Sequence, residues 1–285
     1  MSALGSARVV PPFALDFSSR RPFRDLHPRF LAALQPLADW PACAQYDELA
    51  REVPLAPDAK LPRFVDQNRD LVTRCGGYEE HVSKLSAVPT RQSNWHDFFN
   101  MVVWAHFPKL RWALNALHVD PNAGPKDPRN GRAPAQNLAA TLDEAGMLVT
   151  STSPRVLAEL QALRFKRAFW DMRAELLETT QFWLVGHGML ESLLTPHTAL
   201  AARSPLIHVP SHPTAENTDA FRWELDALVA TQVQTWRTTR PVLDIVPLLA
   251  IPGYWDNDSA EFYDDPANIR FDPLSRRPQA VAELG

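Results

Sequence analysis

Apolar side chains cover most of the circumference of residues 95–107, which predicts a helix buried on nearly all sides. Asn94 precedes this segment and is a suitable N-cap, while Asp97 stands three residues later, where a capping-box acid is common. Pro108 ends or kinks the helix, and we expect a second short helix over residues 109–117. This is the most strongly patterned part of the chain.

A second long pattern begins at Ser153-Pro154, an N-cap followed by proline at the first helical position. Apolar residues at helical spacing predict a helix that runs, with or without a break, to about residue 194. His187 falls on the inward arc of this helix and Glu191 on its edge. The rest of the arc consists of Phe165, Phe169, Met172, Leu176, Trp183, Leu190 and Leu194.

Two β-prone runs, residues 138–142 and 147–151, flank a short polar segment that ends in Gly146. This arrangement predicts a β-hairpin, with Gly146 supplying a positive φ in the turn. Proline-marked segments elsewhere predict loops, and shorter amphipathic patterns predict helices. The predicted short helices cover residues 28–37, 42–53 and 219–234.

Together these patterns predict a mainly α-helical α+β fold, with one compact domain over residues 1–285 and a small antiparallel hairpin or sheet. Residues 1–27 are proline-rich and are expected to lie on the body as an extended arm. Residues 252–285 are aromatic and acidic without periodicity, and we expect a long irregular tail that wraps the domain. The tail is expected to be pinned by Trp255, Phe262, Tyr263 and Phe271.

The composition is that of an ordinary globular protein, with 45% hydrophobic and 22% charged residues among 285. A net charge of −4 gives no general basic surface, so we expect no nucleic-acid partner. No apolar run approaches the roughly 18–20 residues that span a bilayer, so no membrane partner is expected either. The first residues lack the pattern of a secretory signal. The two cysteines, Cys43 and Cys75, fit reduced thiols in the cytoplasm, although one disulfide is arithmetically possible.

His187 and Glu191 are the most informative candidates for chemistry. Their i, i+4 spacing lets the two side chains share one metal ion or one hydrogen bond. Gly186 and Gly188 flank the histidine, and each glycine destabilises a helix by about 1 kcal/mol. Another element therefore approaches closely at these glycines, or the helix breaks there. The structural alternative is a core histidine that is hydrogen-bonded to Glu191.

The start of the buried helix contributes a second set. His96 would lie in the first turn, where the helix dipole favours a neutral ring that can bind a metal or accept a proton. We assign Arg91, Trp95 and Asn100 to substrate binding. Arg91 either binds an anion near the helix start or pairs with Asp97, which could equally be an ordinary helix-start acid.

Asp143 and Glu144 occupy the predicted hairpin turn, where paired acids are commonly solvated. The alternative is that one of them reaches the region of His96 and His187. His106, which shares a helix face with apolar residues, is expected to be a packed core histidine.

The leading hypothesis is an enzyme that hydrolyses a small polar substrate with the help of a divalent metal ion. Its catalytic residues would be His96, Asp97, Asp143, Glu144, His187 and Glu191. The metal ligands would be His96, His187 and Glu191. The second hypothesis is a non-catalytic binding or assembly protein, in which the histidine–acid pairs are structural. A metal-free acid/base enzyme is a third possibility, between these two. The sequence contains no HExxH, CxxC, GxSxG, Walker or GxGxxG motif.

In VPTRQSNWHDFFNMVVWAHFPKLRWALNALH the sequence resembles a bacterial family known as domain of unknown function 3025 (DUF3025). The likeness continues through LDEAGMLV, FWLVGHGMLESLLTPHTAL, IPGYWDNDSAEFYDD and the following IRF, over about residues 62–272. The resemblance implies no activity. It implies a match to the blocks of this family for the PGYW turn at residues 252–255 and for the candidates Arg91, Asn94, Trp95, His96, Asp97, Asn100, Asp143, Glu144, His187 and Glu191.

Overall fold

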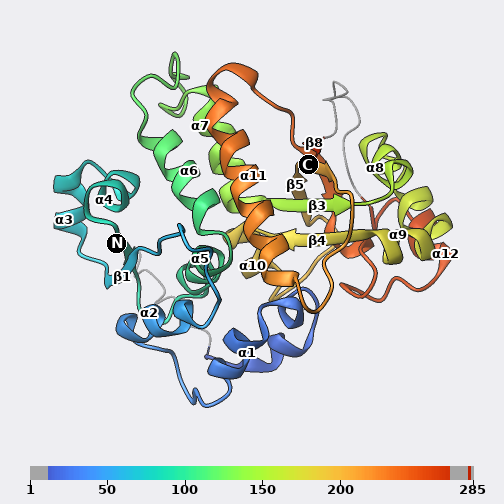
Figure 1. The fold of residues 1–285 in the computed structure, drawn as a ribbon, viewed down its shortest axis with the longest axis horizontal. Helices are drawn as coiled ribbons and strands as arrows, with labels where there is room; N and C mark the ends of the chain where they lie inside the picture. Colours follow the sequence, from blue (N-terminus) through green and yellow to red (C-terminus); the bar gives the residue numbers. More distant parts are fainter. Residues whose placement is uncertain (1–11, 270–281, 284–285) are drawn as a thin grey trace, which may run out of the picture.

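The computed structural model describes residues 12–269 and 282–283, and its helices are joined by short strands, which confirms the mainly helical α+β class (Figure 1). The α-helices are α1 (Pro28–Leu34), α2 (Cys43–Arg51), α3 (Arg69–Cys75), α4 (Tyr78–Leu85), α5 (Trp95–His106), α6 (Pro108–Val119), α7 (Pro134–Ala145), α8 (Pro154–Gln161), α9 (Arg173–Thr179), α10 (His187–Ser192), α11 (Thr218–Thr239) and α12 (Ala260–Asp264). The strands are β1 (Arg63–Asp66), β2 (Ala87–Thr90), β3 (Met147–Ser151), β4 (Thr180–Leu184), β5 (Ala201–Ser204), β6 (Leu206–His208), β7 (Asp244–Pro247) and β8 (Ala282–Glu283). Short 3-10 turns η1 (Leu15–Ser19), η2 (Phe23–Asp25) and η4 (Leu248–Ala250) and a π-helical turn η3 (Arg167–Asp171) complete the described elements.

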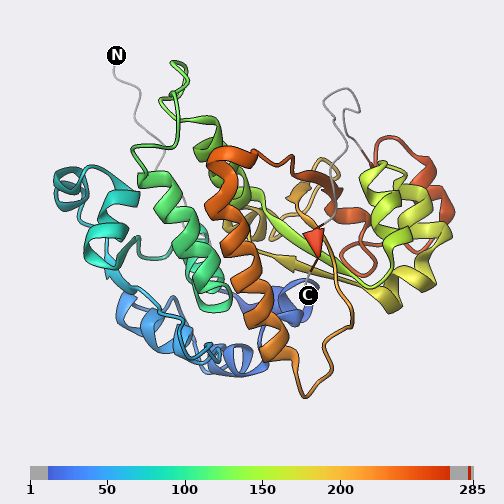
Figure 2. The same cartoon turned by 45° about the horizontal axis from the view of Figure 1, so that its top comes forward.

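The largest described sheet has four strands in the order β4-β3-β6-β8. β3 pairs with β4 antiparallel and with β6 parallel, and all five β3 residues are buried. The sheet lies between the helices at the two ends of the molecule, and α6 and α11 lie side by side next to it (Figures 1 and 2). Two-stranded sheets pair β1 with β2 and β5 with β7.

Helix α5 forms the centre of the core, as its pattern predicts. The Asn94 side chain accepts a hydrogen bond from the backbone N–H of Asp97, and every α5 residue except His96 is buried. His106 is a core histidine: its Nε2 accepts from the His27 backbone N–H, and its Nδ1 faces the Val102 carbonyl at 2.8 Å. Burial lowers the pKa of His106 to about 3, so the ring is neutral.

The described part of the N-terminal segment is not extended as expected. It contains the turns η1 and η2, which insert Phe17 and Phe23 against Trp95, Phe98 and Phe99. Aromatic burial therefore shapes this segment, because each ring removes a large apolar area from water. Residues 1–11 of the expected arm lie outside the described residues.

The predicted hairpin over residues 138–151 is wrong in its first half. Residues 138–142 belong to α7, whose start is favoured by Pro134 at the first position and by Gln136, which accepts from the Ala133 backbone N–H. The strand over residues 147–151 is confirmed, but its antiparallel partner is β4. Gly146 has φ −79° and ends α7, so it supplies no positive φ.

The long helix predicted after Ser153 starts correctly and then divides. The Ser153 side chain accepts from the Val156 backbone N–H, but α8 ends before Leu163, which has φ +60°. The π-helical turn, α9, β4 and α10 follow. Trp183 therefore lies on β4, which pairs with β3, and not on the helix that carries His187.

Residues 252–269, the described part that follows η4, are irregular apart from α12, and residues 282–283 form β8. Tyr263 is buried, and its hydroxyl donates to the Ala250 carbonyl, whereas Trp255 is 43% exposed and does not pin the tail. Phe262 packs partly buried against the core. Phe271 lies outside the described residues.

Among the residues that the structure describes, no helix combines the length and the apolar character that crossing a bilayer requires.

Asp226 of α11 holds the start of α6, because its two carboxylate oxygens accept hydrogen bonds from the backbone N–H groups of Lys109 and Leu110. Burial raises the pKa of Asp226 to about 6, so the group is ionised at pH 8. At that pH we expect Asp226→Ala to lower the free energy of unfolding by about 2–4 kcal/mol, since two first-turn donors lose their acceptors. Urea unfolding measures this loss. Exposed Glu224→Ala on the same helix should change stability by less than about 0.5 kcal/mol, and an equal effect of both variants would contradict the interpretation.

Candidate functional site

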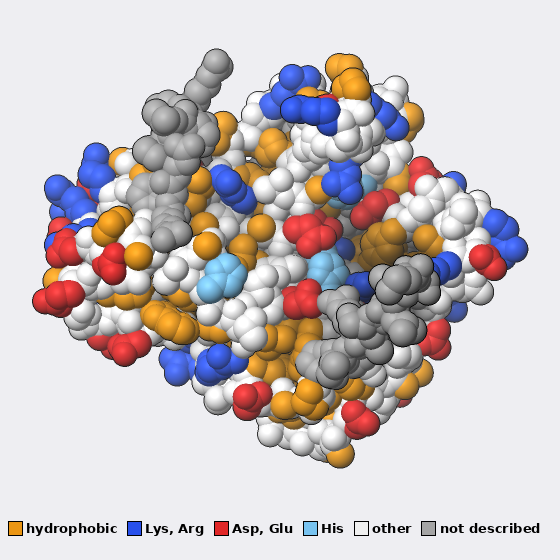
Figure 3. Space-filling model, turned by 180° about the vertical axis from the view of Figure 1, so that it is seen from behind, with side chains coloured by type: hydrophobic (Ala, Val, Ile, Leu, Met, Phe, Trp, Pro, Cys, Tyr) orange, Lys and Arg blue, Asp and Glu red, His pale blue; other side chains and the backbone are white. Residues whose placement is uncertain are grey.

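Three helix ends meet where the candidate histidines and acids lie. His96 stands in the first turn of α5, Asp143 and Glu144 in the last turn of α7, and His187 and Glu191 on α10. Helix α10 packs against both α5 and α7. On the face shown in Figure 3, histidine and acidic side chains lie next to one another near the centre.

The two histidine rings are in direct contact. His96 Nε2 and His187 Nε2 are 2.9 Å apart, and the ring centroids are separated by 4.3 Å. His187 is only 5% exposed, and the His96 side chain is 28% exposed. Two imidazoles that are 91 positions apart in the sequence therefore converge at one partly enclosed point.

A carboxylate lies behind each ring. Glu191 Oε2 is 3.0 Å from His96 Nδ1, and Asp143 Oδ1 is 3.5 Å from His187 Nδ1. The hydrogen bond to Glu191 favours the His96 tautomer that carries its proton on Nδ1, whereas His187 Nδ1 has no hydrogen-bond partner among the described residues. The 2.9 Å contact between the two Nε2 atoms is a hydrogen bond when one ring carries its proton on Nε2, and a cation can stand between the two nitrogens when neither ring does.

Glu144 completes the arrangement. Its Oε1 is 3.9 Å from His96 Nε2 and 3.6 Å from His187 Nε2. One ligand atom from each of the three residues lies within 4.8 Å of the other two. Glu144, and not Glu191 as the sequence predicted, therefore lies within reach of both Nε2 atoms, while Glu191 lies against His96 Nδ1.

The two glycines beside His187 allow α10 to approach α7. A Cβ on Gly186 would come within 2.3 Å of the Gly146 backbone nitrogen, and one on Gly188 within 2.5 Å of Glu144 Oε2. Both reasons that the sequence suggested apply at Gly186: another element approaches closely, and α10 begins directly after it.

Asp97 is paired with Arg91. Its Oδ2 accepts from the Arg91 backbone N–H at 2.6 Å and from Nε at 3.0 Å, while Oδ1 accepts from Nη2 at 2.7 Å. These bonds raise the pKa of Arg91. The structure therefore favours the pairing alternative, and Asp97 positions Arg91 at the cavity. Trp95 is 7% exposed, packs in the aromatic cluster with Phe17, and is not among the cavity-lining residues.

A polar cavity of about 220 Å³ opens beside the two histidines. Its lining residues are Gln67, Tyr78, Glu79, Pro89, Arg91, His96, Asp97, Asn100, Arg111, Asp143, Glu144 and His187. Asn100, which the sequence assigned to substrate binding, does line it and donates to the Tyr78 hydroxyl. The walls carry four carboxylates against two guanidinium groups, so acidic side chains outnumber basic ones around the cavity.

Arg111 is the main residue that the sequence interpretation missed. It is 4% exposed, pairs with Asp143, and donates from Nη2 to Asn100 Oδ1. Burial lowers its pKa, and burial together with the charge of Arg111 lowers the pKa of His187 to about 3. One signal in the sequence could have indicated its burial. Arg111 stands three residues before Leu114, on the inner face of the helix predicted over residues 109–117.

Glu79, His118 and Asp143 form a second group whose ligand atoms also lie within 4.8 Å of one another. Asp143 in this group is already paired with Arg111. The guanidinium therefore provides the positive charge at this position.

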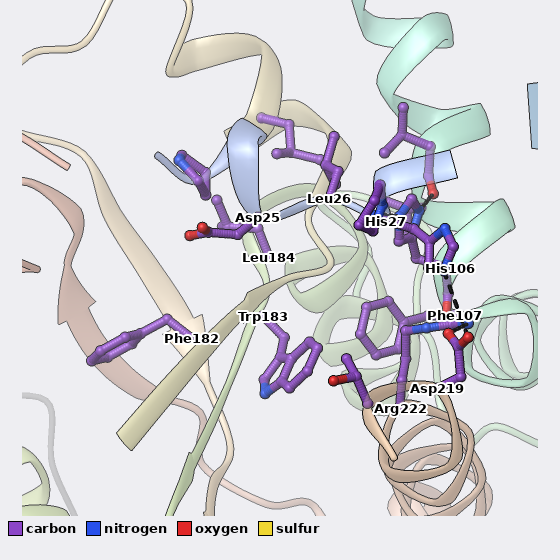
Figure 4. Close-up of a pocket in the computed structure, with 16 residues that line it drawn as sticks. Asp25, Leu26, His27, His106, Phe107, Phe182, Trp183, Leu184, Asp219 and Arg222 are labelled. Atoms are coloured by element: carbon purple, nitrogen blue, oxygen red, sulfur yellow. Dashed lines mark hydrogen bonds and ion pairs between the residues drawn. The ribbon is translucent and has the colours of Figure 1, made fainter. Parts of the chain in front are cut away.

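A separate apolar cavity of about 100 Å³ lies between η2, β4 and α11. Figure 4 shows Trp183 near Phe107 there, with Asp219 beside Arg222. Arg222 donates to the carbonyls of His106 and Pro54 and to Asp219 Oδ1. The polar groups beside this cavity are therefore hydrogen-bonded to one another. For this reason we place the functional site in the polar cavity instead.

Comparison with known proteins yields one match. The family model described as "Protein of unknown function (DUF3025)" matches residues 62–272, which include all three cluster residues and both supporting acids. No curated protein and no solved structure matches the chain.

Gly188→Ala tests whether Glu144 belongs to the cluster. The new Cβ would displace the Glu144 carboxylate, so we expect affinity for Zn²⁺ to fall by roughly tenfold or more, while alanine supports the helix. Calorimetric titration of metal-free protein with Zn²⁺ measures the affinity. Ser192→Ala on the same helix is the control and should bind Zn²⁺ as the wild type does. Unchanged affinity in Gly188→Ala would show that Glu144 is not a ligand.

Proposed function

The chain belongs to the DUF3025 family, and we propose that it is an enzyme that hydrolyses a small polar substrate with a divalent metal ion held by His96, Glu144 and His187. The observation that carries this proposal is the 2.9 Å approach of two Nε2 atoms, each on a ring with a carboxylate behind it. Histidines that ligate metals are commonly oriented by such carboxylates.

The third ligand is more accessible than the two histidines, which supports an open metal position. The Glu144 side chain is 54% exposed, whereas His187 is enclosed. Catalytic metal sites typically keep a position for water or substrate, while structural sites are closed. Three protein ligands beside a polar cavity fit the catalytic pattern.

The charge of the cavity supports cation binding. Its carboxylates exceed its guanidinium groups by two. A divalent ion would neutralise this excess, which lowers the cost of burying like charges next to one another.

A metal ion in this position would lower the pKa of a bound water towards neutrality. The chain supplies a base for the proton, since Glu144 has two oxygens and can ligate through one while the other accepts. The activated water would attack the electrophilic atom of the substrate bond, and Glu144 would pass the proton to the leaving group. Glu191 and Asp143 would hold the two rings in orientation throughout.

The alternative of a binding or assembly protein keeps the same pairs as structural hydrogen bonds. An aromatic partner surface is only partly available among the described residues, because Trp236 is 3% exposed while Trp255 is 43% exposed. The two functions predict different effects of removing the histidines. An enzyme with a metal site would lose metal binding, whereas a protein with structural pairs would lose stability.

Elemental analysis of protein purified without a His-tag tests the proposal. We expect about one equivalent of a divalent transition metal, or uptake of one equivalent of Zn²⁺. His96→Ala and Glu144→Gln should lose this metal and remain folded by circular dichroism, since both side chains are partly exposed. His197→Ala, at an exposed position, should retain it.

Less than about 0.1 equivalent of metal, with none taken up on addition, would end the metal proposal. A large loss of stability in both variants together with unchanged metal content would favour the structural alternative.

A further inference from the structure

Arg111 extends into the wall of the polar cavity from α6. It lines the cavity, yet it is only 4% exposed. Its guanidinium lies over the Trp104 ring, 5.1 Å from the centroid, so one face of the group is covered by an aromatic surface. A cation in such surroundings interacts strongly with any acceptor that reaches it, because little water screens the contact.

The hydrogen-bonding capacity of this guanidinium is not exhausted by the protein. An arginine offers five N–H donors. Nη2 donates to Asn100 Oδ1 and Nη1 lies against Asp143, but neither Nη1 nor Nε makes a hydrogen bond to an acceptor among the described residues. A buried donor without an acceptor costs about 1–3 kcal/mol, so such groups usually meet a ligand or water.

The other buried arginine next to a cavity provides a contrast. Arg222 is also 4% exposed, but it donates to two backbone carbonyls and to Asp219. Arg222 is held by acceptors from the protein. In Arg111, by contrast, N–H donors remain without an acceptor from the described residues.

We propose that Arg111 binds a carboxylate of the substrate, so that the cavity takes a small organic acid with a hydrolysable amide or ester bond. The reaction in this statement rests on the proposed function, whereas the recognition of the carboxylate does not require it. Arg111 and the cluster of His96, Glu144 and His187 line the same cavity or border it, so one small molecule can reach both.

The charges of the cavity favour a singly charged acid. A divalent ion in the cluster cancels the excess of two carboxylates in the walls. A carboxylate then adds one negative charge opposite Arg111, whereas a doubly charged phosphate would add two charges beside Glu79 and Asp143. A planar carboxylate also matches the planar guanidinium.

The reaction balances with water alone. Hydroxide adds to the amide or ester carbonyl carbon, the bond to nitrogen or oxygen breaks, and the proton released from the water passes to that leaving atom. The products are two smaller molecules, of which one keeps the carboxylate at Arg111.

A matched pair of probes tests the proposal: N-acetylglycine and its neutral amide N-acetylglycinamide. We expect the zinc-loaded wild type to bind the acid at least about tenfold more tightly than the amide in calorimetric titration. Arg111→Lys keeps the charge but not the fork of donors, and should reduce this preference to about threefold or less. Zinc content should stay unchanged in this variant.

Asn100→Asp is a second variant in case Arg111→Lys does not fold. It places a carboxylate of nearly the same shape against Arg111 Nη2 and should reduce the preference in the same way. Arg222→Lys is the matched control, because it changes an equally buried guanidinium outside this cavity. It should keep the wild-type preference.

Three results would overturn the assignment: equal binding of acid and amide to the wild type, a preference that survives in both Arg111→Lys and Asn100→Asp, or a preference that is lost in the control. The titrations are repeated on metal-free protein. A preference for the acid that depends on Arg111 without any zinc uptake would keep the carboxylate site and reject the proposed hydrolysis.

Discussion

The approach of two imidazole nitrogens to 2.9 Å is the constraint on which the candidate site depends. Each ring has an acid at its other nitrogen, Glu191 behind His96 and Asp143 behind His187. The contact is a hydrogen bond when one Nε2 carries a proton, and the proposed metal ion would place its positive charge between the two nitrogens instead. Glu144 Oε1 lies within 4 Å of both nitrogens, where it can contact that same charge. On this geometry we propose a cation site with three protein ligands.

The fold enforces this geometry through three helix ends. The buried face of α5 fixes the helix and leaves His96 as its one residue that is not buried. Two glycines let α10 come close enough to α7 for His187 to meet the acids of the last α7 turn. Arg111 then compensates Asp143 from α6 and connects the cluster to Asn100. The supporting interactions therefore come from elements that are distant in sequence and meet only in the folded chain.

Local patterns in the sequence predicted a substantial part of this arrangement. Asn94 as a cap and the apolar circumference of α5 were readable because they depend on neighbours within one helix. The predicted i, i+4 pairing of His187 with Glu191 was wrong, because Glu191 bonds to His96, which α5 brings to α10 only in the folded chain. The place of Glu144 beside the histidines was not predicted either, because Asp143 and Glu144 were assigned to a hairpin turn. On a helix, Glu144 points at the histidines, and only the tertiary packing of α7 against α10 shows this. Arg111 was missed since a single arginine in an apolar helix gives no local sign of its partners.

A crystal structure grown with Zn²⁺, with anomalous scattering recorded at the zinc edge, tests the central claim most directly. The account predicts one ion about 2.0–2.1 Å from Nε2 of both His96 and His187, with a Glu144 oxygen as the third protein ligand. The account would be contradicted by two rings that remain joined through a nitrogen–nitrogen hydrogen bond, with no anomalous density between them.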